Sequence, residues 1–253
     1  MEFEFYYYVI FLAAGFLGGF VDSIAGGGGI ITVPVFLAAG MPPHMALATN
    51  KLGSSFGSFT ASINFIRKGL VSFKEVYLGV IFTFIGAVIG AKTILLVDAS
   101  ILNKIIPVML VAIFLYTLLN PAFGHLDKAN RLKKPVFFLI FGILIGFYDG
   151  FFGPGTGNFW TIALVGLMGL NLKKATATTK IMNFTSNIVS LYVFIMSANV
   201  LFFVGILMGM GQILGAFVGS SMVIKKEITF IRTFFLFVVG VTILKLIYDS
   251  WLK

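Results

Sequence analysis

Two lysines and two aspartates stand in segments that are otherwise apolar enough to lie inside a membrane. Asp22 and Asp149 each precede or enter a glycine-rich stretch, and Lys51 and Lys180 each lie about seven residues into a predicted helix. Ionisable residues at membrane depth are costly, and they are functional candidates for that reason. A buried lysine needs an anion nearby or it loses its proton. The four residues therefore predict either an anion site or internal ion pairs.

The two glycine-rich stretches supply the second candidate feature. "GFVDSIAGGGG" begins at Gly19, and "GFYDGFFGPGTG" begins at Gly146. Glycine permits positive φ and close chain approach, and N–H groups at a helix start carry positive partial charge that binds anions. Close helix packing or a plain turn is the alternative interpretation. The candidate anion-binding residues in and beside these stretches are Gly26, Gly27, Gly28, Gly29, Thr32, Gly153, Gly155, Thr156, Gly157 and Asn158.

Two asparagines complete the candidate substrate-binding set. Asn50 is adjacent to Lys51, and Asn183 follows Lys180 by one helical turn. An asparagine can donate to an anion oxygen or bridge two helices, and a lysine near a helix end can snorkel to the interface. The two aspartates have three possible roles: helix capping, ion pairing with the lysines, or proton coupling. A structural role or a role in proton coupling is favoured over direct contact with the anion, because a charged carboxylate repels an anion.

Composition defines the class of protein that carries these residues. The chain has 253 residues, is 59% hydrophobic and has 11% charged residues, against about 25% in soluble proteins. Its mean hydropathy is +1.05. We predict an all-α polytopic membrane protein, since a span needs about 20 apolar residues. The apolar runs cover 5–23, 44–66, 76–97, 105–119, 135–148, 175–196, 200–222 and 233–248.

Several function classes are excluded by what the chain contains. The net charge of +9 comes from lysines and arginines in short loops, which form no basic face for nucleic acid. Two histidines and no cysteine argue against a metal site, and no cofactor is expected. The acidic start "MEFEF" differs from a signal peptide, so the first span is expected to be retained. No Gly-Lys-Ser/Thr follows either glycine stretch, and no catalytic set indicates an enzyme.

Internal similarity divides the chain into two halves. Three stretches recur in order: "GFVDSIAGGGG" as "GFYDGFFGPGTG", "GMPPHMALATNK" as "GLNLKKATATTK", and "GAVIGA" as "GAFVGS". The offset is 127 residues in the first match and 129 in the others, so Asp22 matches Asp149 and Lys51 matches Lys180. We predict a first repeat over 1–120, a basic cytoplasmic linker over 121–134 and a second repeat over 135–253.

The distribution of basic residues predicts that the second repeat is inverted. Five crossings per half place 12 of the 18 basic residues in cytoplasmic loops. The total is ten membrane segments if the short stretches 30–41 and 158–169 are counted as segments. As a helix, each of these stretches would be only about 18 Å long. The loops before them must then dip into the membrane, which is tolerated only where backbone is buried or lines a wet cavity. An odd number of crossings inverts the second half and places both termini outside.

These loops resemble a known family. "GFVDSIAGGGGIITVP", "PPHMALATNKLGSSFGSFTASINFIRKG", "GFYDGFFGPGTGNFW" and "ATTKIMNFTSNIVSLYVF" are similar to the TauE/SafE family of sulfite exporter-like permeases, in particular its YfcA-like branch. The likeness covers both halves. It implies a secondary carrier of the bacterial inner membrane for small anions such as sulfite or organosulfonates. It leaves the exact substrate, the direction of transport and the coupling ion open.

The sequence-based expectation is therefore alternating access of two repeats around a small anion, within the lipid bilayer. An anion channel that uses the same helix dipoles is the first alternative. A subunit of a membrane complex that does not itself transport is the second. Whether copies of the chain form a homo-oligomer is left open. Inverted repeats with broken helices place the substrate near the membrane midplane, where the two glycine-rich loops would meet.

Overall fold

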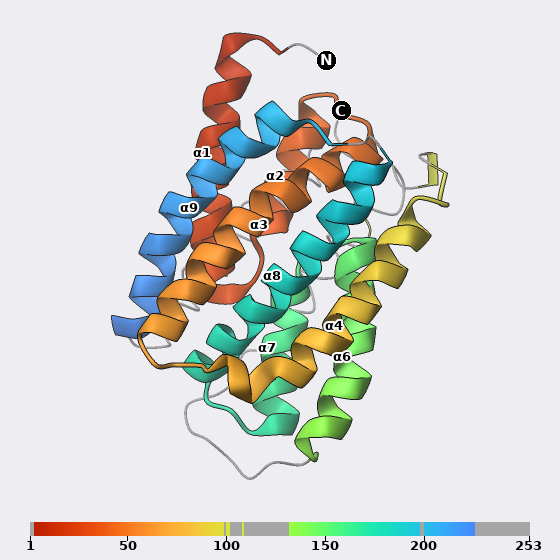
Figure 1. Ribbon diagram of the computed structural model, residues 1–253. Coiled ribbons are helices and arrows are strands. Elements are labelled where there is room, and N and C mark those ends of the chain that lie inside the picture. The colour runs from red at the N-terminus through yellow and green to blue at the C-terminus, as the bar shows by residue number, and fades with distance from the viewer. Residues whose placement is uncertain (1–2, 99, 102–107, 109–131, 198–199, 226–253) are drawn as a thin grey trace.

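The computed structural model describes residues 3–98, 100–101, 108, 132–197 and 200–225, and all regular secondary structure in these ranges is helical (Figure 1). The predicted fifth and tenth segments, 105–119 and 233–248, lie outside the described residues apart from residue 108. The helices are α1 (Phe5–Ala25), α2 (Gly28–Ala38), α3 (Pro43–Arg67), α4 (Phe73–Ile94), α6 (Lys134–Phe151), α7 (Thr156–Met168), α8 (Leu172–Met196) and α9 (Phe202–Lys225).

The helices fall into three kinds by length and polarity. Four described helices, α1, α4, α6 and α9, are long and apolar enough to cross a membrane. Two others, α2 and α7, are apolar but have only 11 and 13 residues. The remaining pair, α3 and α8, have 25 residues each and bury many polar side chains. The all-helical membrane class predicted from composition is confirmed.

Large apolar side chains cover much of the outside of the bundle, while polar side chains occupy its inside. Exposed examples are Leu144 at 61%, Phe203 at 69% and Tyr192 at 66%. By contrast, Lys51 and Lys180 are only 2% and 0% exposed. An exposed apolar surface of this extent is unusual for a soluble monomer but suits contact with lipid.

The helix contacts interleave the two halves of the chain. From the second half, α9 packs along α1 and α3, while α4 from the first half packs along α6 and α8. Between these two groups, α3 and α8 contact each other. Glycines bring the backbones close: a Cβ on Gly86 would overlap Ile143 of α6, and one on Gly215 would overlap Phe16 of α1. Each half therefore buries helices against the other.

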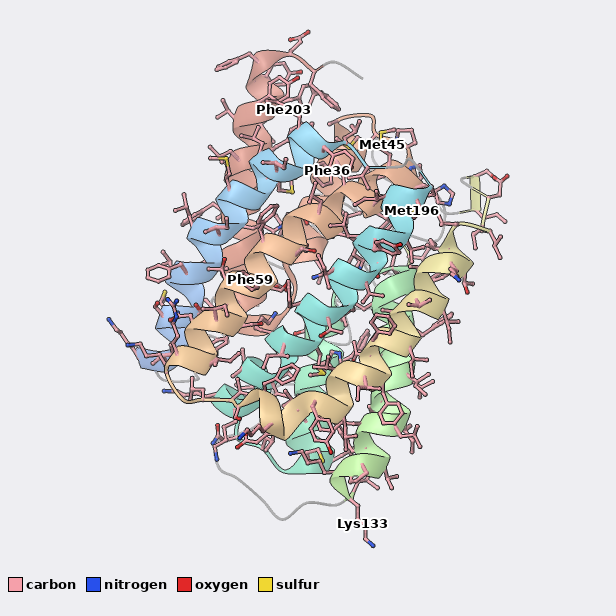
Figure 2. The ribbon with its side chains drawn as sticks, viewed as in Figure 1. Phe36, Met45, Phe59, Lys133, Met196 and Phe203 are labelled. Atoms are coloured by element: carbon pink, nitrogen blue, oxygen red, sulfur yellow. The ribbon has the colours of Figure 1, made fainter. Side chains whose placement is uncertain are left out.

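The direction of the helices can be followed in the figures. In Figure 1, α1 runs down from its start at the top, α2 returns upward, and α3 runs down the full bundle. Figure 2 shows Met45, near the start of α3, and Met196, at the end of α8, at the same end, with Lys133 at the opposite end. Thus α3 and α8 are antiparallel. The ten-segment inverted repeat stays a prediction.

Candidate functional site

The two glycine-rich loops lie in contact with each other inside the bundle. Gly26 ends α1 with φ of 83°, and its N–H donates to the Asp22 carbonyl at 2.8 Å. Gly153, which follows α6, has φ of 97°. A Cβ on Gly26 would overlap the Gly157 backbone, and one on Gly29 would lie 3.1 Å from Pro154 Cα. The absence of side chains at these places lets the loops meet.

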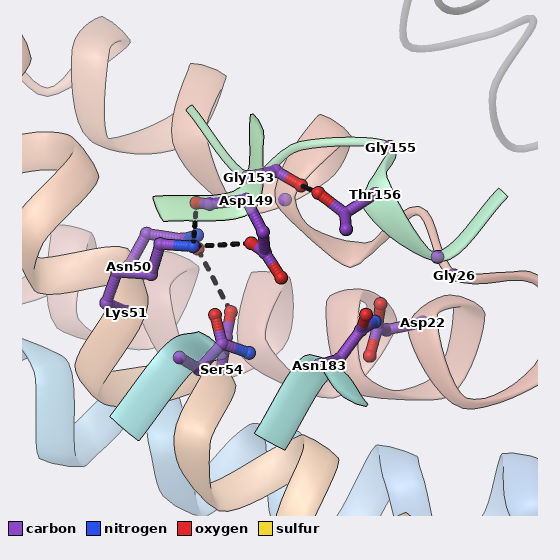
Figure 3. Close-up of a pocket in the computed structure, with 13 residues that line it drawn as sticks. Asp22, Gly26, Asn50, Lys51, Ser54, Asp149, Gly153, Gly155, Thr156 and Asn183 are labelled. Atoms are coloured by element: carbon purple, nitrogen blue, oxygen red, sulfur yellow. Dashed lines mark hydrogen bonds and ion pairs between the residues drawn. The ribbon is translucent and has the colours of Figure 1, made fainter. Parts of the chain in front are cut away.

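The first ion pair joins α3 to the end of α6. Lys51 Nζ lies 2.5 Å from Asp149 Oδ1 and donates to the Asp149 carbonyl at 2.5 Å (Figure 3). The two side chains are 2% and 4% exposed. Ser186 Oγ donates to Oδ2, the other carboxylate oxygen. The carbonyl belongs to the last turn of α6, where unpaired carbonyls carry negative partial charge, so the ammonium is held by two kinds of acceptor.

The second ion pair repeats this geometry at the end of α1. Lys180 Nζ lies 2.9 Å from Asp22 Oδ2 and donates to the Asp22 carbonyl at 2.6 Å. The Asp22 side chain is 19% exposed, whereas that of Lys180 is 0% exposed. Each pair thus joins a lysine from one half of the chain to an aspartate from the other half. Of the roles left open by the sequence, ion pairing is the one that the geometry displays.

A small polar cavity lies between the loops and the two polar helices (Figure 3). Only about 20 Å³ of it can hold the centre of a water molecule, which is room for about one water. Its lining combines loop glycines with charged and amide side chains: Asp22, Gly26, Gly29, Asn50, Lys51, Ser54, Asp149, Gly153, Gly155, Thr156, Gly157, Asn183 and Asn187.

Most of the predicted site residues line this cavity, and five do not. Gly27, Gly28, Thr32, Asn158 and Lys180 are absent from the lining. Thr32 lies behind the lining, where its hydroxyl donates to Asn50 Oδ1 at 2.5 Å. Gly28 is packed against α1, since a Cβ there would lie 2.7 Å from the Gly18 carbonyl. Lys180 acts on the cavity through Asp22, its lining partner.

Two lining residues are not among the predicted substrate-binding residues: Ser54, and Asn187, for which helix bridging was the favoured interpretation. Ser54 lies one turn beyond Asn50, and Asn187 lies one turn beyond Asn183, so each falls on the face that the candidates define. Asn187 Nδ2 donates to Ser58 Oγ at 3.5 Å, which joins α8 to α3 directly below the cavity lining. Taken alone, a serine or asparagine on a helix is weak evidence, because such residues commonly bridge helices.

One lining group has no partner. Asn183 Oδ1 is buried and accepts no hydrogen bond in the part of the chain that the structure describes. A buried carbonyl oxygen without a donor costs about 1–3 kcal/mol. The formal charges beside it cancel, because two lysines face two aspartates. The cavity is therefore polar and uncharged overall, with an acceptor that a ligand or a proton-bearing group could satisfy.

Long apolar helices around a polar cavity with buried ion pairs define a polytopic membrane protein with an internal polar site, as transporters have. Comparison with known proteins identifies the group. Residues 11–246 match the family described as "Sulfite exporter TauE/SafE". The chain belongs to this family, whose relatives are named as membrane transporters and not as enzymes.

Three relatives resemble the chain over most of its length. A probable membrane transporter protein of Haemophilus influenzae is 43% identical over 241 residues, which are 95% of this chain and 94% of that protein. The probable membrane transporter protein YfcA of Escherichia coli K12 is 46% identical, with 96% and 90% covered. The probable membrane transporter protein ORF9 of a Sinorhizobium species is 45% identical, with 91% and 88% covered. No solved structure matches the chain.

Proposed function

We propose that the protein is a secondary transporter of small anions in the bacterial inner membrane, with sulfur-containing oxyanions such as sulfite or organosulfonates as its substrate class. The observation that carries this proposal is the pair of crossed ion pairs, Lys51–Asp149 and Lys180–Asp22, beside one polar cavity. Lys51, the glycine backbone and the start of α7 line the cavity and offer positive charge and N–H donors to an anion, and Lys180 stands behind Asp22. The family name agrees with the substrate class.

The interleaved contacts support alternating access between two groups of helices, each of which contains helices from both halves of the chain. Because α4 and α9 each pack on the other half, the chain forms two mixed groups: α1 with α9, and α4 with α6. The loops and ion pairs lie where these groups meet, so a rocking motion of one against the other would open the cavity to one side at a time. This is the arrangement expected of inverted repeats around a central site.

The size of the cavity favours a carrier over a channel. A space that holds about one water is too small for a hydrated oxyanion, so binding requires the two groups of helices to separate. A rearrangement of this kind is expected of a carrier. A conducting channel needs a continuous path, which would leave the two buried lysines more exposed than the observed 2% and 0%.

Anion binding is testable by thermal unfolding of the purified protein. Sulfite, sulfate and methanesulfonate are added separately, with chloride at equal ionic strength as the control. A ligand at a hundred times its dissociation constant stabilises the folded state by about 2.7 kcal/mol, so a bound anion raises Tm measurably. Proteoliposome flux then separates the alternatives: a carrier saturates and shows counterflow. No stabilisation by any of the three anions, together with no flux, would contradict the proposal.

The proposed topology makes a separate prediction. Ten segments with an inverted second half place both ends of the chain in the periplasm, because each half crosses five times. Reporters fused before residue 1 and after residue 253 should both give periplasmic activity, and a reporter in the linker 121–134 should give cytoplasmic activity. If the two terminal reporters lie on opposite sides of the membrane, the predicted inverted repeat is wrong. The linker reporter serves as the internal control for insertion.

A further inference from the structure

We propose that the two ion pairs differ in role: Asp22 takes up a proton when an anion binds, whereas Asp149 stays charged throughout. The inference rests on the anion transport proposed above and names the ion that accompanies the substrate. The added step is the protonation of a carboxylate: a proton from the aqueous phase forms an O–H bond on one Asp22 carboxylate oxygen, and no other covalent bond forms or breaks.

The two carboxylates are held unequally. Both oxygens of Asp149 have strong partners, because Oδ1 lies 2.5 Å from Lys51 Nζ and Oδ2 accepts from the Ser186 hydroxyl. For Asp22, Oδ2 lies 2.9 Å from Lys180 Nζ, while the Gly28 N–H donates to Oδ1 at the longer distance of 3.4 Å. The Asp22 side chain is 19% exposed against 4% for Asp149. Among the described residues, the Asp22 carboxylate is therefore held by weaker contacts than the Asp149 carboxylate.

The sequence itself contains this difference. Lys180 follows Lys51 by 129 residues, and at the same offset Ser186 corresponds to Gly57. The second half therefore supplies a hydroxyl to the Asp149 carboxylate, and the matched position of the first half has no side chain with which to do so. In place of a hydroxyl, the Gly57 position is filled by Gln212 of α9, whose Oε1 lies 2.6 Å from where a Cβ would stand. The inequality is thus a property of the residue types.

The charge balance explains why an anion would bring a proton. With both pairs intact the cavity is neutral, and an anion entering it meets the two carboxylates and the Lys51 ammonium, while Lys180 stands behind Asp22. Protonation of Asp22 leaves the positive charge of Lys180 uncompensated, so the site gains one net positive charge at the moment when a negative ligand arrives. Opposite charges in a buried site stabilise each other, and the two binding events become favourable together.

A ready acceptor exists for the new O–H group. Asn183 Oδ1 is buried, lacks a donor among the described residues and lines the same small cavity as Asp22. A charged carboxylate cannot satisfy this oxygen, because both groups only accept hydrogen bonds. A protonated Asp22 can donate to it. The cavity thus offers an acceptor among its lining residues for the O–H group of a protonated Asp22.

Few other charges act on Asp22. Lys180 of α8 contacts it, and Lys51 of α3 and Asp149 of α6 share its cavity. The helices α2 and α7 contain no titratable side chain, whereas Lys225 stands at the end of α9 that is nearer to Asp22, since Gly219 packs on Ser23. Among the described residues, Lys180 is the charged side chain that contacts Asp22.

The test measures protons taken up on anion binding by the purified full-length protein. Calorimetric titrations with sulfate or methanesulfonate, whose charges are constant near neutral pH, are repeated in buffers of different ionisation enthalpy. The wild type should take up about one proton per anion, and its affinity should fall by about tenfold per pH unit once Asp22 is charged in the free protein. The Asp22→Asn variant should bind the anion without proton uptake and with an affinity independent of pH.

Asp98→Asn, at an exposed carboxylate outside the cavity, is the control, and it should retain the proton uptake of the wild type. If it does not fold, the comparison of wild type with Asp22→Asn decides alone. Anion binding by the wild type without proton uptake would overturn the inference and leave the proposed transport standing, as would unchanged proton uptake in a folded Asp22→Asn variant. No binding of either anion by the folded wild type would overturn both.

Discussion

Lys51→Met will abolish anion transport and will lower the free energy of unfolding by about 3–5 kcal/mol, because it leaves the Asp149 carboxylate buried without its cation. The loss of stability follows from the 2.5 Å contact between Lys51 Nζ and Asp149 Oδ1 and the 4% exposure of the Asp149 side chain. Thermal unfolding in detergent and proteoliposome uptake of sulfite measure the two effects separately.

A double variant separates the structural role of the pair from its functional role. Lys51→Met combined with Asp149→Leu removes both charges, and replacing a buried pair by apolar residues is often neutral or stabilising. The double variant should therefore regain most of the lost stability, while uptake stays absent because the cavity has lost a cation that lines it. Normal uptake by a stable double variant would show that the Lys51–Asp149 pair serves the fold only.

Gly153→Ala should reduce transport by at least about tenfold, since the new methyl group would lie against the first ion pair. At this position φ is 97°, and a Cβ would stand 2.8 Å from Lys51 Nζ and 3.2 Å from Asp149 Oδ1. The methyl group must displace the ammonium, which removes a charge-assisted contact of the kind whose loss costs about 2–5 kcal/mol. Uptake rate, normalised to the amount of monodisperse protein, is the measurement.

Gly40→Ala provides the matched control for the backbone cost. Gly40 has φ of 82° and no atom within 4 Å of its Cβ position. This variant therefore meets only the penalty of a left-handed conformation, about 1–2 kcal/mol, and should transport normally. The difference between the two variants isolates the contact with the ion pair. Equal transport by both would mean that the Gly153 loop tolerates displacement of Lys51 and is not part of the site.

Much of the architecture could be predicted because hydrophobicity is a local property of the chain. The predicted runs 5–23 and 44–66 correspond to α1 and α3, and the short stretch 30–41 corresponds to α2. The comparison of the two halves by sequence also identified Asp22 and Lys51, with their counterparts Asp149 and Lys180, as candidate functional residues. Residue type alone marks these positions, because a charge inside an apolar run is costly wherever the run lies in the fold.

The partners of those charges could not be predicted, because pairing is a long-range property. The sequence left capping, ion pairing and proton coupling open for Asp22, and nothing local shows that Lys180, 158 residues away, would contact it. In the same way, Ser186 reads as an ordinary helix serine until packing places it against Asp149. Such choices depend on which helix faces meet across the bundle.

By itself, then, the sequence determined a helical membrane protein with glycine-rich loops and four charges in apolar segments, and it predicted two related halves, since burial preference and spacing act within single helices. Only the tertiary structure decided that Lys51 pairs with Asp149 and Lys180 with Asp22, and that, among the described residues, Asp149 has a hydroxyl partner while Asp22 has none. The physical reason is that an ion pair forms where packing brings two side chains within about 4 Å, and packing is decided by the whole bundle.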